Sequence, residues 1–230
     1  MQIKNNLITI HQQIKQYCLQ VQRPESAVKL LAVSKTKPVE AILAAYHAGQ
    51  TAFGENYVQE GIEKIQYFER QNIQLEWHFI GSLQSNKTKL VAEHFDWMQT
   101  LDRLKTAERL NQQRPLHKAP LNVLIQINIS NEDSKGGIPA EEMSDFAKQL
   151  KNLPHLRLRG LMAIPAATEN EQDQMQVFRQ MELLFRRLQQ EFPTDQIDTL
   201  SMGMSDDMAS AIKCGSTMVR IGTAIFGKRN

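Results

Sequence analysis

The chain is organised around the stretch VKLLAVSK, which occupies residues 28–35. An apolar run of this length is typical of a buried strand, and Pro38 is well placed to open a helix soon after it. The pattern therefore puts the amine of Lys35 at the carboxyl end of a first parallel strand. Partial burial disfavours the charged form of a lysine, so an amine in this place can condense with an aldehyde. A solvated loop lysine is the alternative.

Similar apolar runs recur along the chain and alternate with segments of helical period. The expected strands are residues 28–35, 51–55, 75–81, 97–101, 121–129, 156–164, 199–202 and 218–226. The expected helices between them include residues 38–49, 58–70, 103–113, 139–150 and 170–191. Strands that alternate with helices predict a mainly parallel sheet with right-handed crossovers. Eight of them predict an α/β fold, a single (β/α)8 barrel of the TIM type that forms one domain over residues 1–230.

A further helix is expected before the first strand. Its apolar residues recur at steps of three and four, and they are Ile3, Leu7, Ile10, Ile14, Tyr17 and Val21. The last expected strand ends so close to Asn230 that no helix is expected after it. We therefore expect the N-terminal helix to cover the wall of the barrel beside the last strand. An open doubly wound sheet is the alternative architecture, although no G-x-G-x-x-G motif follows the first strand.

The composition excludes several classes of protein. The formal net charge is +2 and the basic residues are dispersed, so nothing predicts binding to nucleic acid. No apolar run approaches the roughly 20 residues that a membrane-spanning helix needs. Cys18 and Cys214 lie far apart in the sequence, which is typical of reduced thiols in a cytoplasmic protein. The six histidines show no ligand spacing, so no metal site is predicted.

The carboxyl ends of the last two strands carry the chemistry expected of a phosphate site. The strands of such a barrel converge at this face, and the loops after strands seven and eight commonly bind phosphate. The segment SMGMS, which begins at Ser201, offers hydroxyls and a glycine, while Gly222 and Thr223 add two backbone N–H donors and a third hydroxyl. Arg220 lies among apolar residues and needs a partner. That partner is either a carboxylate such as Glu55 or an acceptor on a ligand.

A lysine for an aldehyde, a phosphate site and an inward-facing arginine together describe a site for pyridoxal 5′-phosphate (PLP). Five long strings make the chain resemble the pyridoxal phosphate homeostasis protein family nearly from end to end. They are LAVSKTK at 31–37, FGENYVQE at 53–60, WHFIGSLQSNK at 77–87, LSMGMSDD at 200–207 and VRIGTAIFG at 219–227.

The resemblance implies a fold-type III PLP barrel, like the cofactor domain of alanine racemase. It makes Lys35 the Schiff-base lysine and Arg220 the partner of the pyridine nitrogen. Ser201, Gly222 and Thr223 become phosphate ligands, and Asn56 lies near the ring. Lys37 and Lys135 are further lysines near this face. Lys135 could also receive the aldehyde, and a solvated lysine in a polar loop is the alternative that its neighbours favour.

The arginine also bears on catalysis. A guanidinium donates a hydrogen bond but does not give up its proton, so it leaves the ring nitrogen neutral and supports carbanion chemistry poorly. Racemases of this type add a tyrosine from a C-terminal domain of the partner subunit, and no such domain is expected here.

The expected protein is therefore a cytoplasmic monomer. It holds PLP as a Schiff base on Lys35 and acts in intracellular vitamin B6 homeostasis as a carrier or buffer, with PLP-dependent apo-enzymes as possible recipients. A barrel-only amino-acid racemase is the alternative. A Schiff-base aldolase that works without a cofactor is a third possibility.

Overall fold

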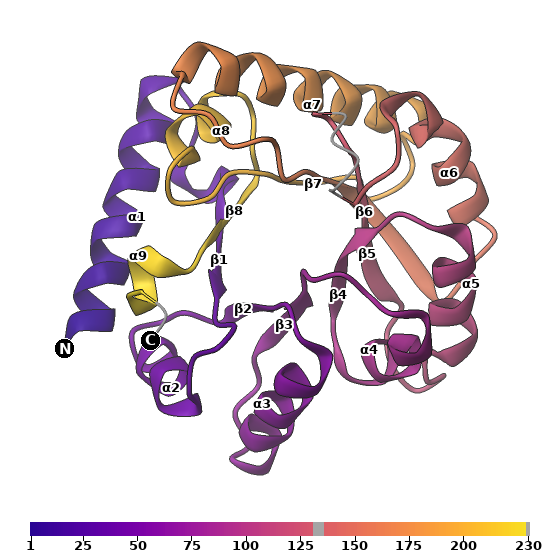
Figure 1. The fold of residues 1–230 in the computed structure, drawn as a ribbon, viewed down its shortest axis with the longest axis horizontal. Helices are drawn as coiled ribbons and strands as arrows, with labels where there is room; N and C mark the ends of the chain where they lie inside the picture. The colour runs from indigo at the N-terminus through magenta and orange to yellow at the C-terminus, as the bar shows by residue number, and fades with distance from the viewer. Residues whose placement is uncertain (131–135, 229–230) are drawn as a thin grey trace.

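The computed structural model describes residues 1–130 and 136–228. Its centre is a closed barrel in which every strand pairs in parallel with the next, and the last pairs with the first. The strands are β1 (Lys29–Val33), β2 (Ala52–Glu55), β3 (Glu76–Phe79), β4 (Trp97–Leu101), β5 (Leu121–Gln126), β6 (Leu156–Met162), β7 (Thr199–Ser201) and β8 (Met218–Ile221). Figure 1 shows them as an inner ring with the helices outside. The predicted (β/α)8 barrel is confirmed.

The helices of the outer ring follow the expected alternation. They are α1 (Gln2–Gln20), α2 (Val39–His47), α3 (Val58–Arg70), α4 (Thr88–His94), α5 (Leu104–Gln113), α6 (Met143–Leu150), α7 (Glu171–Glu191), α8 (Met208–Lys213) and α9 (Thr223–Phe226). The described residues also form the short 3-10 helices η1 (Glu25–Ala27), η2 (Ser85–Lys87) and η3 (Ala140–Glu142). None of the helices in the described ranges is long and apolar enough to cross a membrane.

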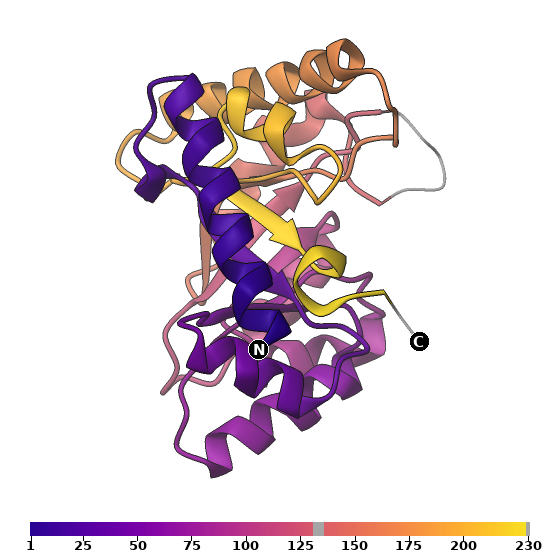
Figure 2. The ribbon, with the colours of Figure 1, turned by 90° about the vertical axis from the view of Figure 1, so that its left-hand side faces the viewer.

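Helix α1 covers the wall formed by the last strand, as expected. Figure 2 shows it lying across this side of the barrel, beside β8 and α9. Leu7, Ile10 and Ile14 of its apolar stripe are buried. The side-chain amide of Asn6 donates to the carbonyl oxygen of Ile225 at 2.8 Å, which ties the start of the chain to its end.

The predicted last strand, residues 218–226, is wrong in its second half. Strand β8 ends at Ile221, and the short helix α9 follows where no helix was expected. The N–H groups of Ile225 and Phe226 both donate to the carbonyl oxygen of Gly222, which closes the first turn. Residues 224–226 are all apolar, and an apolar run this short does not separate strand from helix by its period.

The inside of the barrel differs from its outer layer. Residues that point outward from the strands, such as Phe53, Phe79 and Val219, pack with the helices in one large apolar core. The alternating residues point inward and form two small apolar clusters, one around Leu31 and one around Leu124. The inside also holds four buried polar side chains that are hydrogen-bonded to one another, and they are His78, Gln99, Ser201 and Arg220.

Candidate functional site

A cavity of about 540 Å³ opens at the carboxyl ends of the strands. Its wall contains Lys35, Asn56, Arg220, Gly222 and Thr223, so the fold brings these predicted site residues together. The remaining wall includes apolar side chains and part of the segment after β7, and its members are Val33, Ile80, Ile164, Met204, Ser205, Asp206 and Ala224. One amine, one guanidinium, one carboxylate and two hydroxyls therefore belong to the wall of a partly apolar space.

Ser201 does not lie in this wall. It is fully buried at the end of β7, where its hydroxyl accepts a hydrogen bond from Nη1 of Arg220 at 2.8 Å and donates one to Oε1 of Gln99 at 2.6 Å. Its role as a phosphate ligand stays a prediction, whereas its observed contact is with the arginine. Ser205 is the hydroxyl of the SMGMS segment that reaches the wall, and it is exposed.

The guanidinium of Arg220 donates hydrogen bonds to two acceptors, the Ser201 hydroxyl and the Ala163 carbonyl oxygen. It is only 4% exposed, and its Nη2 donates to the carbonyl oxygen of Ala163 at 3.0 Å in addition to the bond with Ser201. Burial lowers the pKa of the guanidinium to about 10 against the opposing charge of Asp207, so Arg220 is charged at neutral pH. The suggested pairing of Arg220 with Glu55 is not found, because the Glu55 carboxylate binds Ser34 and Lys64 instead.

The turn that carries Lys35 is fixed by hydrogen bonds on both sides. The N–H of Ser34 donates to the carbonyl oxygen of Gly54, and the N–H of Lys37 donates back to that of Ser34, each at 3.0 Å. Between them Thr36 has a φ of 62°, a left-handed conformation that is uncommon for threonine. Its N–H donates to the carboxylate of Glu60 at 2.6 Å, which compensates for the strained conformation.

Beneath this turn lies a buried ion cluster that the sequence analysis missed. Lys64 is 5% exposed, and its Nζ lies 2.8 Å from both the Ser34 carbonyl oxygen and Oε1 of Glu55, and 2.6 Å from Oε1 of Glu60. The Ser34 hydroxyl donates to the same Glu55 oxygen at 2.6 Å. Burial raises the pKa of Glu55, and the charge and hydrogen bond of Lys64 oppose that shift. A lysine on the buried face of the helix at 58–70 was the available signal.

We expect Lys64→Met to lower the free energy of unfolding by about 3–5 kcal/mol, because it leaves the Glu55 carboxylate buried without its cation. Urea unfolding followed by circular dichroism measures this. The matched control is Lys89→Met, since the Lys89 side chain is 67% exposed and pairs with Glu93 only at 3.7 Å. That change should cost roughly 0.5 kcal/mol or less. Equal losses in the two variants would show that the cluster contributes nothing beyond a surface pair.

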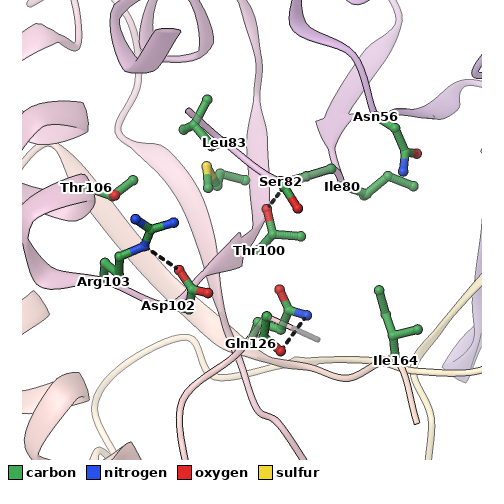
Figure 3. Close-up of a pocket in the computed structure, with 13 residues that line it drawn as sticks. Asn56, Ile80, Ser82, Leu83, Thr100, Asp102, Arg103, Thr106, Gln126 and Ile164 are labelled. Atoms are coloured by element: carbon green, nitrogen blue, oxygen red, sulfur yellow. Dashed lines mark hydrogen bonds and ion pairs between the residues drawn. The ribbon is translucent and has the colours of Figure 1, made fainter. Parts of the chain in front are cut away.

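A second cavity of about 330 Å³ lies beside the first and shares Asn56, Ile80 and Ile164 with it. Figure 3 shows Asp102 and Arg103 on its far side from Asn56. Gly81 also lines it, and a Cβ at Gly81 would lie 2.1 Å from the backbone oxygen of Asn56. Only glycine therefore allows the segment after β3 to approach Asn56 so closely.

The wall of the larger cavity fits PLP by its own chemistry. Lys35 supplies an amine for an aldehyde, and Arg220 supplies a fixed donor. The first N–H groups of a helix have no acceptor within it, so those at the start of α9 suit a phosphate together with the Thr223 hydroxyl. Oδ1 of Asn56 is buried and has no hydrogen-bond partner in residues 1–130 and 136–228, which leaves one acceptor available to a ligand.

Lys37 stands apart from this wall. Nζ of Lys37 donates to the carbonyl oxygens of Gly227 and Lys228, at 3.1 and 3.0 Å, and so ties the turn after β1 to the end of the chain. Lys135 lies outside the described residues.

Comparisons with known proteins show which family the whole chain resembles. The family model "Alanine racemase, N-terminal domain" matches residues 6–230. The pyridoxal phosphate homeostasis protein of Pasteurella multocida is 73% identical over 230 residues, which cover 100% of this chain and 99% of the relative. That of Escherichia coli K12 is 56% identical over 229 residues, with 99% and 97% covered.

Solved structures of other proteins are similar to this chain as well. PipY of Synechococcus elongatus PCC7942, determined with PLP bound, is 35% identical, has a TM-score of 0.84 and aligns over 98% of this chain and 100% of its own. An alanine racemase of Clostridium difficile 630 is 17% identical with a TM-score of 0.74, covers 99% of this chain and 56% of its own, and shares the fold alone. By its barrel and by the length and identity of these matches, the chain belongs to the pyridoxal phosphate homeostasis protein family.

Proposed function

We propose that the chain binds PLP in the 540 Å³ cavity as a Schiff base on Lys35 and serves PLP homeostasis as a carrier or buffer. The observation that carries this proposal is the convergence of Lys35, Arg220 and the start of α9 on one cavity at the carboxyl ends of the strands. The names of the curated relatives and the PLP bound to PipY support it. The proposed working unit is a cytoplasmic monomer, and PLP-dependent apo-enzymes are the proposed recipients.

Each residue has a distinct part in this proposal. Lys35 supplies the nitrogen of the covalent link, and Arg220 donates to the ring nitrogen. Thr223 and the N–H groups at Gly222 and Ala224 hold the phosphate. Val33, Ile80 and Ile164 offer apolar surface to the flat ring. When bound, the cofactor supplies an aldehyde, and the protein's task is to hold it reversibly and keep it from other amines.

The experiment that tests the proposal begins with the cofactor-free protein. On addition of PLP we expect a yellow visible absorption band, and after borohydride reduction mass spectrometry should find the label on Lys35. The loaded protein is then mixed with a PLP-dependent apo-enzyme, and recovery of that enzyme's activity is followed against an equal concentration of free PLP. Absence of the band and of the label would overturn the binding proposal. Absence of any recovery would leave binding intact and overturn the carrier part.

An amino-acid racemase on the same barrel is the second candidate, and the likeness to the alanine racemase fold favours testing it. Two features of the cavity argue against efficient turnover. Arg220 is charged at neutral pH, so it would donate a hydrogen bond to the ring nitrogen without giving it a proton. The titratable groups among the described residues of the wall are Lys35, Asp206 and Arg220, and Asp206 is exposed, so the wall would offer no buried acid–base group besides Lys35 and the permanently charged Arg220.

We therefore expect the loaded protein to exchange the α-proton of L-alanine no faster than free PLP does. The measurement is uptake of deuterium from heavy water by nuclear magnetic resonance, with the enantiomer ratio followed by chiral chromatography. Free PLP at the same concentration is the control, because PLP alone activates amino acids slowly. Turnover in the usual enzyme range of about 1–10³ s⁻¹ would replace the carrier proposal with a racemase.

A further inference from the structure

A continuous line of polar side chains crosses the inside of the barrel and ends at Arg220. The interior of such a barrel is normally packed with Val, Ile and Leu, because a buried polar group costs stability unless it is hydrogen-bonded. Here His78, Gln99 and Ser201 are each fully buried on three different strands. The line runs from Arg220 at the cavity to the half-buried Glu76 at the start of β3.

The hydrogen bonds in the line form one consistent set, in which each group donates to the next from Arg220 to Glu76 when His78 is neutral. A guanidinium only donates, so the Ser201 oxygen accepts from Arg220 at 2.8 Å and its proton goes to Oε1 of Gln99 at 2.6 Å. The amide nitrogen of Gln99 then faces Nδ1 of His78 at 2.8 Å and donates to it. His78 is therefore protonated on Nε2, which donates to Oε1 of Glu76 at 2.5 Å.

At the end of the line away from Arg220, the negative charge of Glu76 keeps the donated proton of His78 on Nε2. Nζ of Lys29 lies 2.5 Å from the same Glu76 oxygen. Burial acts to raise the pKa of Glu76, but the hydrogen bonds from His78 and Lys29 lower it to about 2, so this end is a carboxylate at neutral pH. Burial also lowers the pKa of His78, although Glu76 opposes the shift. A neutral His78 therefore presents Nδ1 as an acceptor to Gln99.

We propose that Gln99 and His78 are positioning residues that aim the guanidinium of Arg220 at the cofactor cavity through the hydroxyl of Ser201. A hydroxyl can rotate, and its free electron pair faces Arg220 only while its proton has an acceptor on the other side. Gln99 provides that acceptor, and the amide cannot turn over without placing its NH2 group against the Ser201 proton. His78 prevents that turn by accepting from the NH2 group. The inference rests on the proposed function only in naming PLP as what Arg220 meets.

The test compares Gln99→Met and His78→Phe with a matched control, Gln50→Met. Phenylalanine at position 78 retains the ring that stacks on Trp97 at 4.9 Å between centroids. Gln50 is also a buried amide, 6% exposed, that donates to the carbonyl oxygens of Leu30 and Ala52 and belongs to neither the line nor the cavity wall. The Gln50→Met variant therefore shows how the loss of a buried amide alone, without any connection to Arg220, affects the protein.

The first readout uses the cofactor-free protein. The exchange of the Arg220 guanidinium protons with water is measured by nuclear magnetic resonance, with the signals assigned by their loss in Arg220→Lys. We expect both line variants to accelerate this exchange at least about tenfold, the factor that corresponds to losing one hydrogen bond to a charged group. Gln50→Met should leave it unchanged. Unaltered exchange in Gln99→Met, or the same acceleration in Gln50→Met, would overturn the proposal.

The second readout is the visible absorption band of bound PLP, which should shift in both line variants and stay in place in Gln50→Met. Because His78 acts only through Gln99, the double variant should match Gln99→Met alone, whereas additive effects would overturn the single line.

If Gln99→Met does not fold, Gln99→Glu retains the acceptor for Ser201 and should preserve the parental Arg220 exchange while His78 gains a second proton. If the parent protein fails to bind PLP, the proposed function fails and the guanidinium exchange still decides the inference.

Discussion

Replacement of Lys35 by alanine is expected to abolish the visible band of bound PLP and the label that borohydride leaves on the protein. The amine of Lys35 lies in the wall of the cavity, on a turn held by Ser34 and Glu60. Loss of this amine removes the nucleophile for the aldehyde, so covalent attachment should fall to background rather than weaken by a factor. The measurement is mass spectrometry of peptides from the reduced, PLP-treated protein.

Two control variants keep this test specific. Lys37→Ala removes an amine that donates to the carbonyl oxygens of Gly227 and Lys228, away from the cavity wall, and should leave the label on Lys35. Lys135→Ala should also leave it there, which tests the other lysine considered at this face. Undiminished labelling of Lys37 or Lys135 in the Lys35→Ala protein would show that the covalent site has been assigned to the wrong residue.

Pyridoxal, which lacks the phosphate, should bind at least about 100-fold more weakly than PLP. Hydrogen bonds to a charged phosphate contribute roughly 1.5–3 kcal/mol each, and the loss of two already corresponds to such a factor. The donors are the first N–H groups of α9 and the hydroxyl of Thr223, and Ser205 lies within the same wall. Titration of the visible band with each compound gives the two dissociation constants.

Single variants locate the phosphate within the cavity. Thr223→Val should reduce the preference for PLP over pyridoxal, because it removes one of these donors and retains the side-chain volume. Ser201→Ala separates the two roles of that residue: if it holds Arg220, both ligands weaken together, whereas if it binds phosphate, only PLP weakens. Comparable dissociation constants of the parent protein for PLP and pyridoxal would place the phosphate somewhere other than the ends of β7 and β8.

The local sequence predicts most of the fold because apolar residues recur with different spacings in strands and in helices. The run at residues 28–35 and the stripe of α1 are both found where their patterns place them. The boundary after β8 was wrong because Thr223–Phe226 is too short for its period to separate strand from helix, and Gly222 starts the turn there. Five of the six predicted site residues meet in one wall since the carboxyl ends of parallel strands share a face: Lys35, Asn56, Arg220, Gly222 and Thr223.

What the sequence by itself determined is thus the barrel, the family resemblance and the position of the amine, since each depends on residues close together in the chain. Only the tertiary structure decided which groups touch. Ser201 meets Gln99, 102 positions away, and is thereby withdrawn from the cavity, while Ser205 reaches it. Lys64 lies beneath the turn of Lys35 because α3 packs against β2, and its amine finds Glu55 there. Such contacts depend on strand register and helix packing, which bring together side chains that no local pattern relates.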